Sequence, residues 1–119
     1  MEILTQKISQ EVVVVTPQGR FDAFSAPNVR ERFEQLLNDE GILNFAVDLS
    51  QTTFLDSAGI AVLVSLLKQT RQKGGDVNLV WPNTEAARRI LTLTRFDKIF
   101  SMFDTREMAV ESFLCRQAV

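Results

Sequence analysis

The sequence predicts a single α/β domain, with a mixed β-sheet of about four to five strands packed against about four α-helices. Two strand-like segments come first, and strand-like and helix-like segments then alternate to the end of the chain. No linker, repeat or low-complexity segment divides it. A length of 119 residues, of which 45% are hydrophobic and 24% charged, is typical of one globular unit with one core. We therefore expect residues 1–119 to form one domain.

Five segments have the composition of β-strands. The clearest is the β-branched run Val12–Val15, which a turn at Pro17–Gly19 follows. A weaker segment precedes it, and we expect these two to form a hairpin. The five expected strands cover residues 3–8, 12–15, 44–49, 76–81 and 99–103.

Four segments have helical periodicity and suitable ends. Ser25 is expected to cap the first, which has Pro27 in its first turn and ends at Gly41. Ser57 is expected to be the N-cap of the second, and Asp104 with Glu107 offers a capping box for the last. The four expected helices run from 25 to 41, from 57 to 73, from Asn83 or Thr84 to about 93, and from 104 onward.

The residue inventory argues against an enzyme. The chain has no histidine, so a Ser-His-Asp triad is impossible, and the single cysteine, Cys115, cannot complete a zinc site. No glycine-rich loop of the nucleotide-binding kind is present. We expect no catalytic residues, no metal and no cofactor. Cys115 lies in an apolar helical stripe and is expected to be a small buried hydrophobe in a reducing, cytoplasmic compartment.

Charge and hydropathy narrow the range of partners. A net charge of −2 argues against nucleic acid, which is bound through clustered positive charge. The N-terminal residues have no signal-peptide character, and no apolar run is long enough to span a membrane. We expect no direct membrane insertion.

The most informative segment is Asp56-Ser57-Ala58-Gly59-Ile60, between an expected strand and an expected helix. Ser57 at the helix start has two readings. It is a helix cap and nothing more, or it is a site that receives a phosphate, because helix N-termini favour anions. Gly59 lowers helix propensity and suggests a close approach to the backbone. Small side chains at Ala58 and Gly59 leave the hydroxyl uncrowded.

A second candidate loop, Gly19-Arg20-Phe21-Asp22, follows the second expected strand. Asp22 is either a turn residue or part of the same site as Ser57. The aromatic residues Phe21, Phe24 and Phe54 flank the two loops. Each is expected in the core, although an apolar patch with a rim of Asp22, Ser25 and Ser57 would suit a docking partner.

These motifs resemble those of the STAS domain family, and in particular its anti-sigma factor antagonists. The segment Leu49–Ile60 resembles the strand, loop and helix start around the phosphorylated serine of the family, and Gly19–Asp22 resembles an earlier family loop. The resemblance covers nearly the whole chain. It implies one STAS-type domain that takes part in bacterial signal transduction and transcription regulation by partner switching.

The resemblance also implies partners. The unphosphorylated protein would bind an anti-sigma factor that is a serine kinase and so free a sigma factor. Phosphorylation of Ser57 would end that binding, the kinase would supply ATP and magnesium, and a PP2C-type serine phosphatase would reset the switch. The implied docking residues are Asp22, Phe21, Ser25, Phe54, Asp56, Ala58, Gly59 and Ile60.

One departure is a reversed charge. Arg20 stands where the family loop frequently has an acidic residue, so the surface of the partner is expected to differ. Other family members are constitutive structural or regulatory subunits of transporters or stress-signalling complexes. In that alternative Ser57 only caps its helix.

Overall fold

The computed structural model describes residues 1–117, which form one mixed sheet with helices on both faces. Its 6 strands lie in the order β1-β2-β3-β5-β6, and β4 pairs with β2 beside that path. β1 is antiparallel to β2, and the other pairings are parallel. The strands are β1 (Glu2–Lys7), β2 (Val12–Phe21), β3 (Asn44–Asp48), β4 (Thr52–Leu55), β5 (Asp76–Val80) and β6 (Ser101–Phe103).

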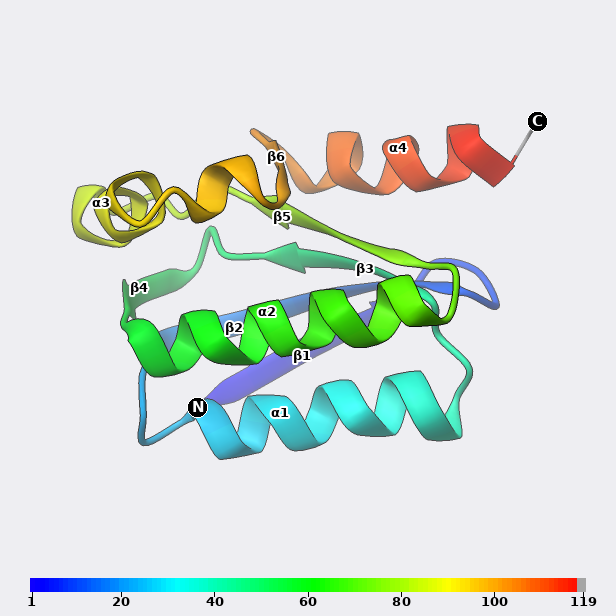
Figure 1. Ribbon diagram of the computed structural model, residues 1–119, viewed down its shortest axis with the longest axis horizontal. Coiled ribbons are helices and arrows are strands. Elements are labelled where there is room, and N and C mark those ends of the chain that lie inside the picture. Colours follow the sequence, from blue (N-terminus) through cyan, green and yellow to red (C-terminus); the bar gives the residue numbers. More distant parts are fainter. Residues whose placement is uncertain (118–119) are drawn as a thin grey trace.

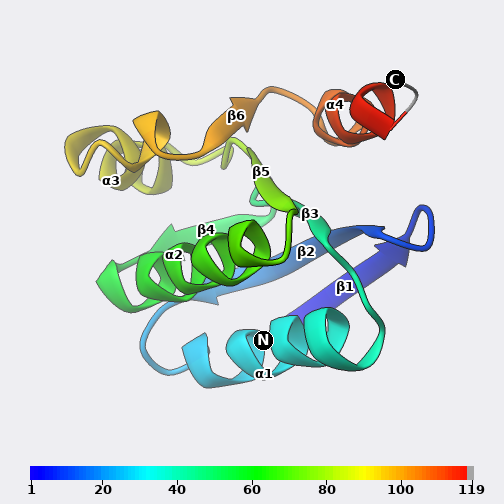
Figure 2. The ribbon, with the colours of Figure 1, turned by 45° about the vertical axis from the view of Figure 1, so that its right-hand side comes forward.

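The helices divide between the two faces of the sheet. α1 and α2 lie side by side on one face, α4 lies on the other, and α3 lies near the end of the molecule that carries β4 (Figures 1 and 2). A short π-helical turn, Gln35–Asp39, extends α1, and a 3₁₀ turn, Phe96–Lys98, follows α3. The helices are α1 (Ala26–Glu34), α2 (Ser57–Gln72), α3 (Glu85–Leu93) and α4 (Arg106–Gln117).

The composition of β2 follows from its position between these layers. Val13 and Val15 belong to the larger hydrophobic cluster, with residues of α1 and α2, whereas Val12 and Val14 belong to a smaller cluster with residues of α4. Because both faces of the first part of β2 are buried, Val12–Val15 is a continuous β-branched run without polar alternation.

The fold class and the N-terminal hairpin are as predicted, but one strand was not foreseen. β2 has 10 residues and β3 has 5, so β2 extends beyond the end of β3. Gly19 to Phe21 at the end of β2 pair instead with β4, across a register shift between Gly19 and Arg20. β4 thus satisfies backbone groups that would otherwise be unpaired at this edge, and it positions the loop that carries Asp56.

α4 is held to the sheet by polar contacts as well as by apolar packing. Arg106 at its start forms an ion pair with the buried Asp48 at the end of β3, with Nε and Oδ2 3.6 Å apart. The amide nitrogen of Asn78 donates to the carbonyl of Ala109 at 2.9 Å. These contacts fix the helix over the smaller cluster.

Three details of the C-terminal half depart from expectation. The strand expected at 99–103 is Ser101–Phe103, because the preceding residues continue the 3₁₀ turn. The capping box at Asp104 is wrong by one residue, since α4 begins at Arg106 and the Thr105 hydroxyl accepts from the Met108 N–H at 3.2 Å. Cys115 is exposed and not buried. Within the part of the chain described here, no helix is long and apolar enough to cross a membrane.

Candidate functional site

The start of α2 is capped by Asp56 and not by Ser57 as the sequence predicted. Asp56 has an extended backbone, with φ −118° and ψ −175°, and its Oδ1 accepts hydrogen bonds from the N–H groups of Ala58 at 2.9 Å and Gly59 at 3.0 Å. Ser57 is therefore the first helical residue. It is exposed, and nothing in the described part of the chain hydrogen-bonds its hydroxyl.

Asp56 also joins the two loops that the sequence singled out. Its second oxygen, Oδ2, accepts from the N–H of Ala23 at 3.1 Å, and its own N–H donates to the carbonyl of Phe21 at 3.4 Å. One carboxylate thus connects the β2–α1 loop to the N-terminus of α2. The structure brings the two loops together, and Asp56 makes the connection.

Asp22 is bonded within its own loop and makes no hydrogen bond to Ser57. Its Oδ1 accepts from the N–H groups of Phe24 at 3.1 Å and Ser25 at 3.2 Å, and its Oδ2 lies 3.2 Å from Nε of Arg20. Partial desolvation raises the pKa of the Asp22 carboxyl, but the backbone donors and the Arg20 guanidinium outweigh it, so the pKa is lowered. The carboxylate form of Asp22 therefore stabilises the loop.

Ser25 precedes α1, with Pro27 in the first turn as expected, but its hydroxyl does not cap the helix. The hydroxyl donates to the carbonyl of Arg20 at 2.7 Å and accepts from the N–H of Asp22 at 3.1 Å. Ser25 and Asp22 thus bond to each other's backbone and close the turn. The two side chains give the loop a fixed shape.

The three phenylalanines near the site have different environments. Phe21 is fully buried, as expected. Phe54 is half-buried, and the guanidinium carbon of Arg20 lies 4.2 Å from the centre of its ring. Phe24 was expected in the core but is 95% exposed, because it lies at the tip of the β2–α1 turn. The sequence does not separate these three environments.

Gly59 does mark a close approach, but the approaching group belongs to the chain itself. A Cβ at this position would lie 2.6 Å from the carbonyl oxygen of Phe21 and 2.8 Å from Cδ1 of Leu55. α2 therefore packs against the ends of β2 and β4 closely enough to require glycine. The close approach that the sequence suggested at Gly59 is therefore explained by packing within the chain.

Burial divides the predicted docking residues into two groups. Phe21, Ser25, Gly59 and Ile60 are buried, so they shape the surface from beneath. The side chains that remain accessible, fully or in part, are those of Asp22, Phe54, Asp56, Ser57 and Ala58.

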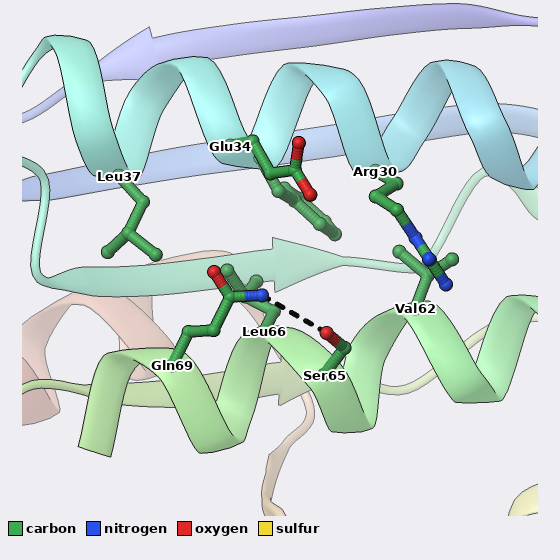
Figure 3. Close-up of a pocket in the computed structure, with 8 residues that line it drawn as sticks. Arg30, Glu34, Leu37, Val62, Ser65, Leu66 and Gln69 are labelled. Atoms are coloured by element: carbon green, nitrogen blue, oxygen red, sulfur yellow. Dashed lines mark hydrogen bonds between the residues drawn. The ribbon is translucent and has the colours of Figure 1, made fainter. Parts of the chain in front are cut away.

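Two hollows lie between α1 and α2. The first, near Ser57, is a groove of about 350 Å³ lined by Ala23, Ala26, Pro27, Arg30, Ala58 and Ala61. We call it the α1–α2 groove. The second, farther along the helices, has about 10 Å³, roughly the space of one water (Figure 3). There Gln69 donates to the Ser65 hydroxyl at 3.1 Å. This second hollow is a packing seam and holds no ligand-sized space.

A metal site is not evident. Over the described residues, no group of three or more histidine, cysteine, aspartate or glutamate side chains is placed to hold an ion. Asp22 and Asp56, the carboxylates of the two candidate loops, are bonded to backbone N–H groups. Their arrangement suits the stabilisation of loops.

Comparison with known proteins agrees with this architecture. The model of the STAS domain family matches residues 4–109. A Thermotoga maritima protein named "Putative anti-sigma factor antagonist" is 33% identical over 106 residues, which are 88% of this chain and 92% of that protein. The anti-sigma-B factor antagonist of Listeria monocytogenes is 36% identical over 61 residues, 51% of this chain and 53% of that protein.

Solved structures give the same result. A Thermotoga maritima crystal structure that carries the same description has a TM-score of 0.84 at 27% identity and covers 92% of each chain. The anti-sigma factor antagonist SpoIIAA in its unphosphorylated form has a TM-score of 0.81 and covers 94% of this chain and 96% of its own, but at 15% identity it shows the shared fold alone. The sequence relatives are named as anti-sigma factor antagonists and not as enzymes, in agreement with the prediction from the residue inventory.

Proposed function

The chain belongs to the STAS domain family, and on that basis we propose that it is an anti-sigma factor antagonist whose Ser57 is a phosphorylation switch. The proposal depends on one observation, which is that the residue that caps α2 and the residue with the free hydroxyl are different. Asp56 caps the helix, so the exposed Ser57 hydroxyl is not needed to stabilise the helix start. A hydroxyl with this freedom suits the active site of a kinase.

In the proposed cycle, the unphosphorylated protein binds an anti-sigma factor serine kinase and frees a sigma factor. The kinase, which brings ATP and magnesium, then phosphorylates Ser57 and releases the protein. A PP2C-type serine phosphatase restores the hydroxyl. Such a cycle takes place in the cytoplasm, and this chain contributes a binding surface and the acceptor hydroxyl but no catalytic group.

The proposed phosphate is compatible with the fold but not with a partner built for a neutral hydroxyl. Phosphoserine carries about −1.5 to −2 charges, and a helix N-terminus favours such an anion by roughly 0.3 to 1 kcal/mol. Against a partner carboxylate 4 Å away, one pair of like charges repels by about 4 kcal/mol at an effective dielectric constant near 20. Half of this value weakens binding more than tenfold, at about 1.4 kcal/mol per factor of ten.

The first experiment is phosphopeptide mass spectrometry on protein isolated from its own cells, before and after stress, with phosphatases inhibited during lysis. We expect phosphate on Ser57 whose occupancy changes with the condition. A Ser57 that is unmodified under every condition would contradict the switch. It would favour a constitutive structural or regulatory subunit of a transporter or stress-signalling complex.

A binding experiment tests whether a negative charge at position 57 weakens the affinity for the kinase. We expect Ser57→Ala to bind the purified kinase as the wild type does, and Ser57→Asp to lose binding. Ser101→Asp is the matched control, because Ser101 is an exposed serine on β6, away from α2. Equal affinities of Ser57→Ala and Ser57→Asp would contradict the proposal.

A further inference from the structure

Phe24 is a large apolar side chain in an unfavourable position. It is 95% exposed, the highest value among the exposed large hydrophobic residues in the described part of the chain. The backbone around it is nevertheless bonded, since the N–H of Phe24 donates to Asp22 at 3.1 Å and that of Ala23 donates to Asp56 at 3.1 Å. The turn therefore fixes the backbone that presents the ring to water. An exposed aromatic ring on an ordered backbone is suited to act as a docking anchor, because the backbone loses little entropy on binding.

The α1–α2 groove begins beside this ring. Ala23 precedes Phe24 in the same turn and lines the groove, and Ala58 and Ala61 line it from α2. Ala58 follows Ser57 directly, and Ala61 lies one helical turn after it. A partner that contacts both Phe24 and the groove would therefore cover the surface around Ser57.

The lining of the α1–α2 groove is positive, because Arg30 is the one charged residue among the six that line it. Asp22 is paired with Arg20, and Asp56 is bonded to backbone N–H groups. Arg30, on α1, lines the groove and is exposed, and no residue in the described part of the chain forms an ion pair with it. In Figure 3 its side chain extends from α1 toward Val62 of α2. The groove thus offers one guanidinium that is free to meet an acidic group.

We infer that Phe24 is the hydrophobic anchor of the partner-docking surface, and that Arg30 in the adjoining groove binds a carboxylate of the partner. This inference rests on the proposed function, so the partner is the anti-sigma factor kinase. Its complementary surface has an apolar pocket for the ring and an acidic side chain for Arg30. A phosphate on Ser57 would oppose this docking by repelling the partner's carboxylate.

The test measures the affinity of purified variants for each recombinant anti-sigma factor serine kinase of the source organism, by titration calorimetry with ADP and magnesium. We expect Phe24→Ala to weaken binding roughly 30-fold or more, which is typical of an anchor residue. Met108→Ala is the matched control, since Met108 is 50% exposed on α4, on the opposite face of the sheet, and should change the Kd less than twofold. Both side chains are exposed, so unchanged melting curves will verify the folds.

The role of the positive charge of Arg30 is tested with a second pair of variants. We expect Arg30→Glu to weaken binding at least tenfold and more than Arg30→Ala does, with a loss that decreases as salt is added. Arg71→Glu, at the far end of α2, makes the same change in net charge and should have little effect.

Two results would overturn the inference, and they are distinguishable. If the wild type binds a kinase and Phe24→Ala binds it equally well, or Arg30→Glu equals Arg71→Glu, the docking assignment is wrong while the proposed function stands. If the wild type itself binds none of the kinases and is phosphorylated by none, the proposed function fails and this inference fails with it.

Discussion

The replacement of Asp56 by alanine is the strongest test of how the site is built. The substitution removes the carboxylate that accepts from Ala58 and Gly59 at the start of α2 and from Ala23 in the neighbouring loop. Loss of a helix N-cap costs about 1 kcal/mol, and loss of the charge-assisted bond to the exposed loop N–H adds roughly another 1 kcal/mol. We therefore expect Asp56→Ala to lower the free energy of unfolding by about 2 kcal/mol.

The assay is thermal unfolding followed by circular dichroism, with urea unfolding as a second measurement. For 119 residues the entropy of unfolding is about 0.25 kcal/mol per degree, so about 2 kcal/mol corresponds to a fall in Tm of roughly 8 °C. Asp56→Asn retains a good capping side chain and should lose less. Ser57→Ala should change stability by less than about 0.5 kcal/mol, because the hydroxyl has no partner in the described part of the chain.

The changes in Tm of Asp56→Ala and Ser57→Ala together show which residue caps α2. If Asp56→Ala leaves Tm unchanged, the Asp56 carboxylate does not cap α2 in solution. If Ser57→Ala costs as much as Asp56→Ala, the serine hydroxyl carries part of the cap. The claim that Ser57 is structurally free would then be refuted.

Three further predictions follow from the same geometry. Gly59→Ala should destabilise the protein by about 1–3 kcal/mol in urea unfolding despite the better helix propensity of alanine, because its Cβ would lie 2.6 Å from the carbonyl oxygen of Phe21; a neutral or stabilising effect would contradict the packing described. The lowered pKa of Asp22 means that its contribution to stability is complete above the ordinary carboxyl range near pH 4 and is lost as the pH falls through the lower folded-state value. Asp22→Asn should therefore flatten the acid limb of a plot of Tm against pH, and an unchanged limb would show that Asp22 is not responsible. Cys115 is exposed, so a maleimide should label it in the native protein without denaturant; labelling only after unfolding would contradict its exposure.

The sequence predicted the sheet and helices because most of their signals are local. Asn44–Asp48 and Asp76–Val80 are short segments rich in apolar residues, and glycine precedes each of them. Thr84, one of the two expected start residues, caps α3. β4 was missed because Thr52–Leu55 has 4 residues and no apolar run. Its strand conformation depends on the length of β2, which extends past β3, and that is a tertiary property that propensity does not encode.

The start of α2 was predicted to within one residue, but the helix cap was assigned to Ser57 instead of Asp56. Asp56 and Ser57 are both good N-caps, and a pattern of apolar spacing places a helix start only to within a residue or two. Phe21 is the last residue of β2 and Phe24 lies three residues later in the turn, where periodicity no longer applies, so nothing in the sequence indicates which ring is buried. Cys115 shows the same limit, because its expected burial depended on the exact phase of α4.

The shift of the cap by one residue has a consequence for the proposed switch. If Ser57 were the cap, phosphorylation would alter the hydroxyl that bonds the helix backbone, and switching would change the stability of the fold. With Asp56 as the cap, the backbone bonds at Ala58 and Gly59 do not involve the group that is modified. A phosphate on Ser57 would add charge beside the loop that presents Phe24, and it would leave the principal bonds of that loop to Asp22 in place. The structure therefore favours a switch that acts by electrostatic repulsion of the partner, and the unfolding curves of phosphorylated and unphosphorylated protein should nearly coincide while their affinities differ.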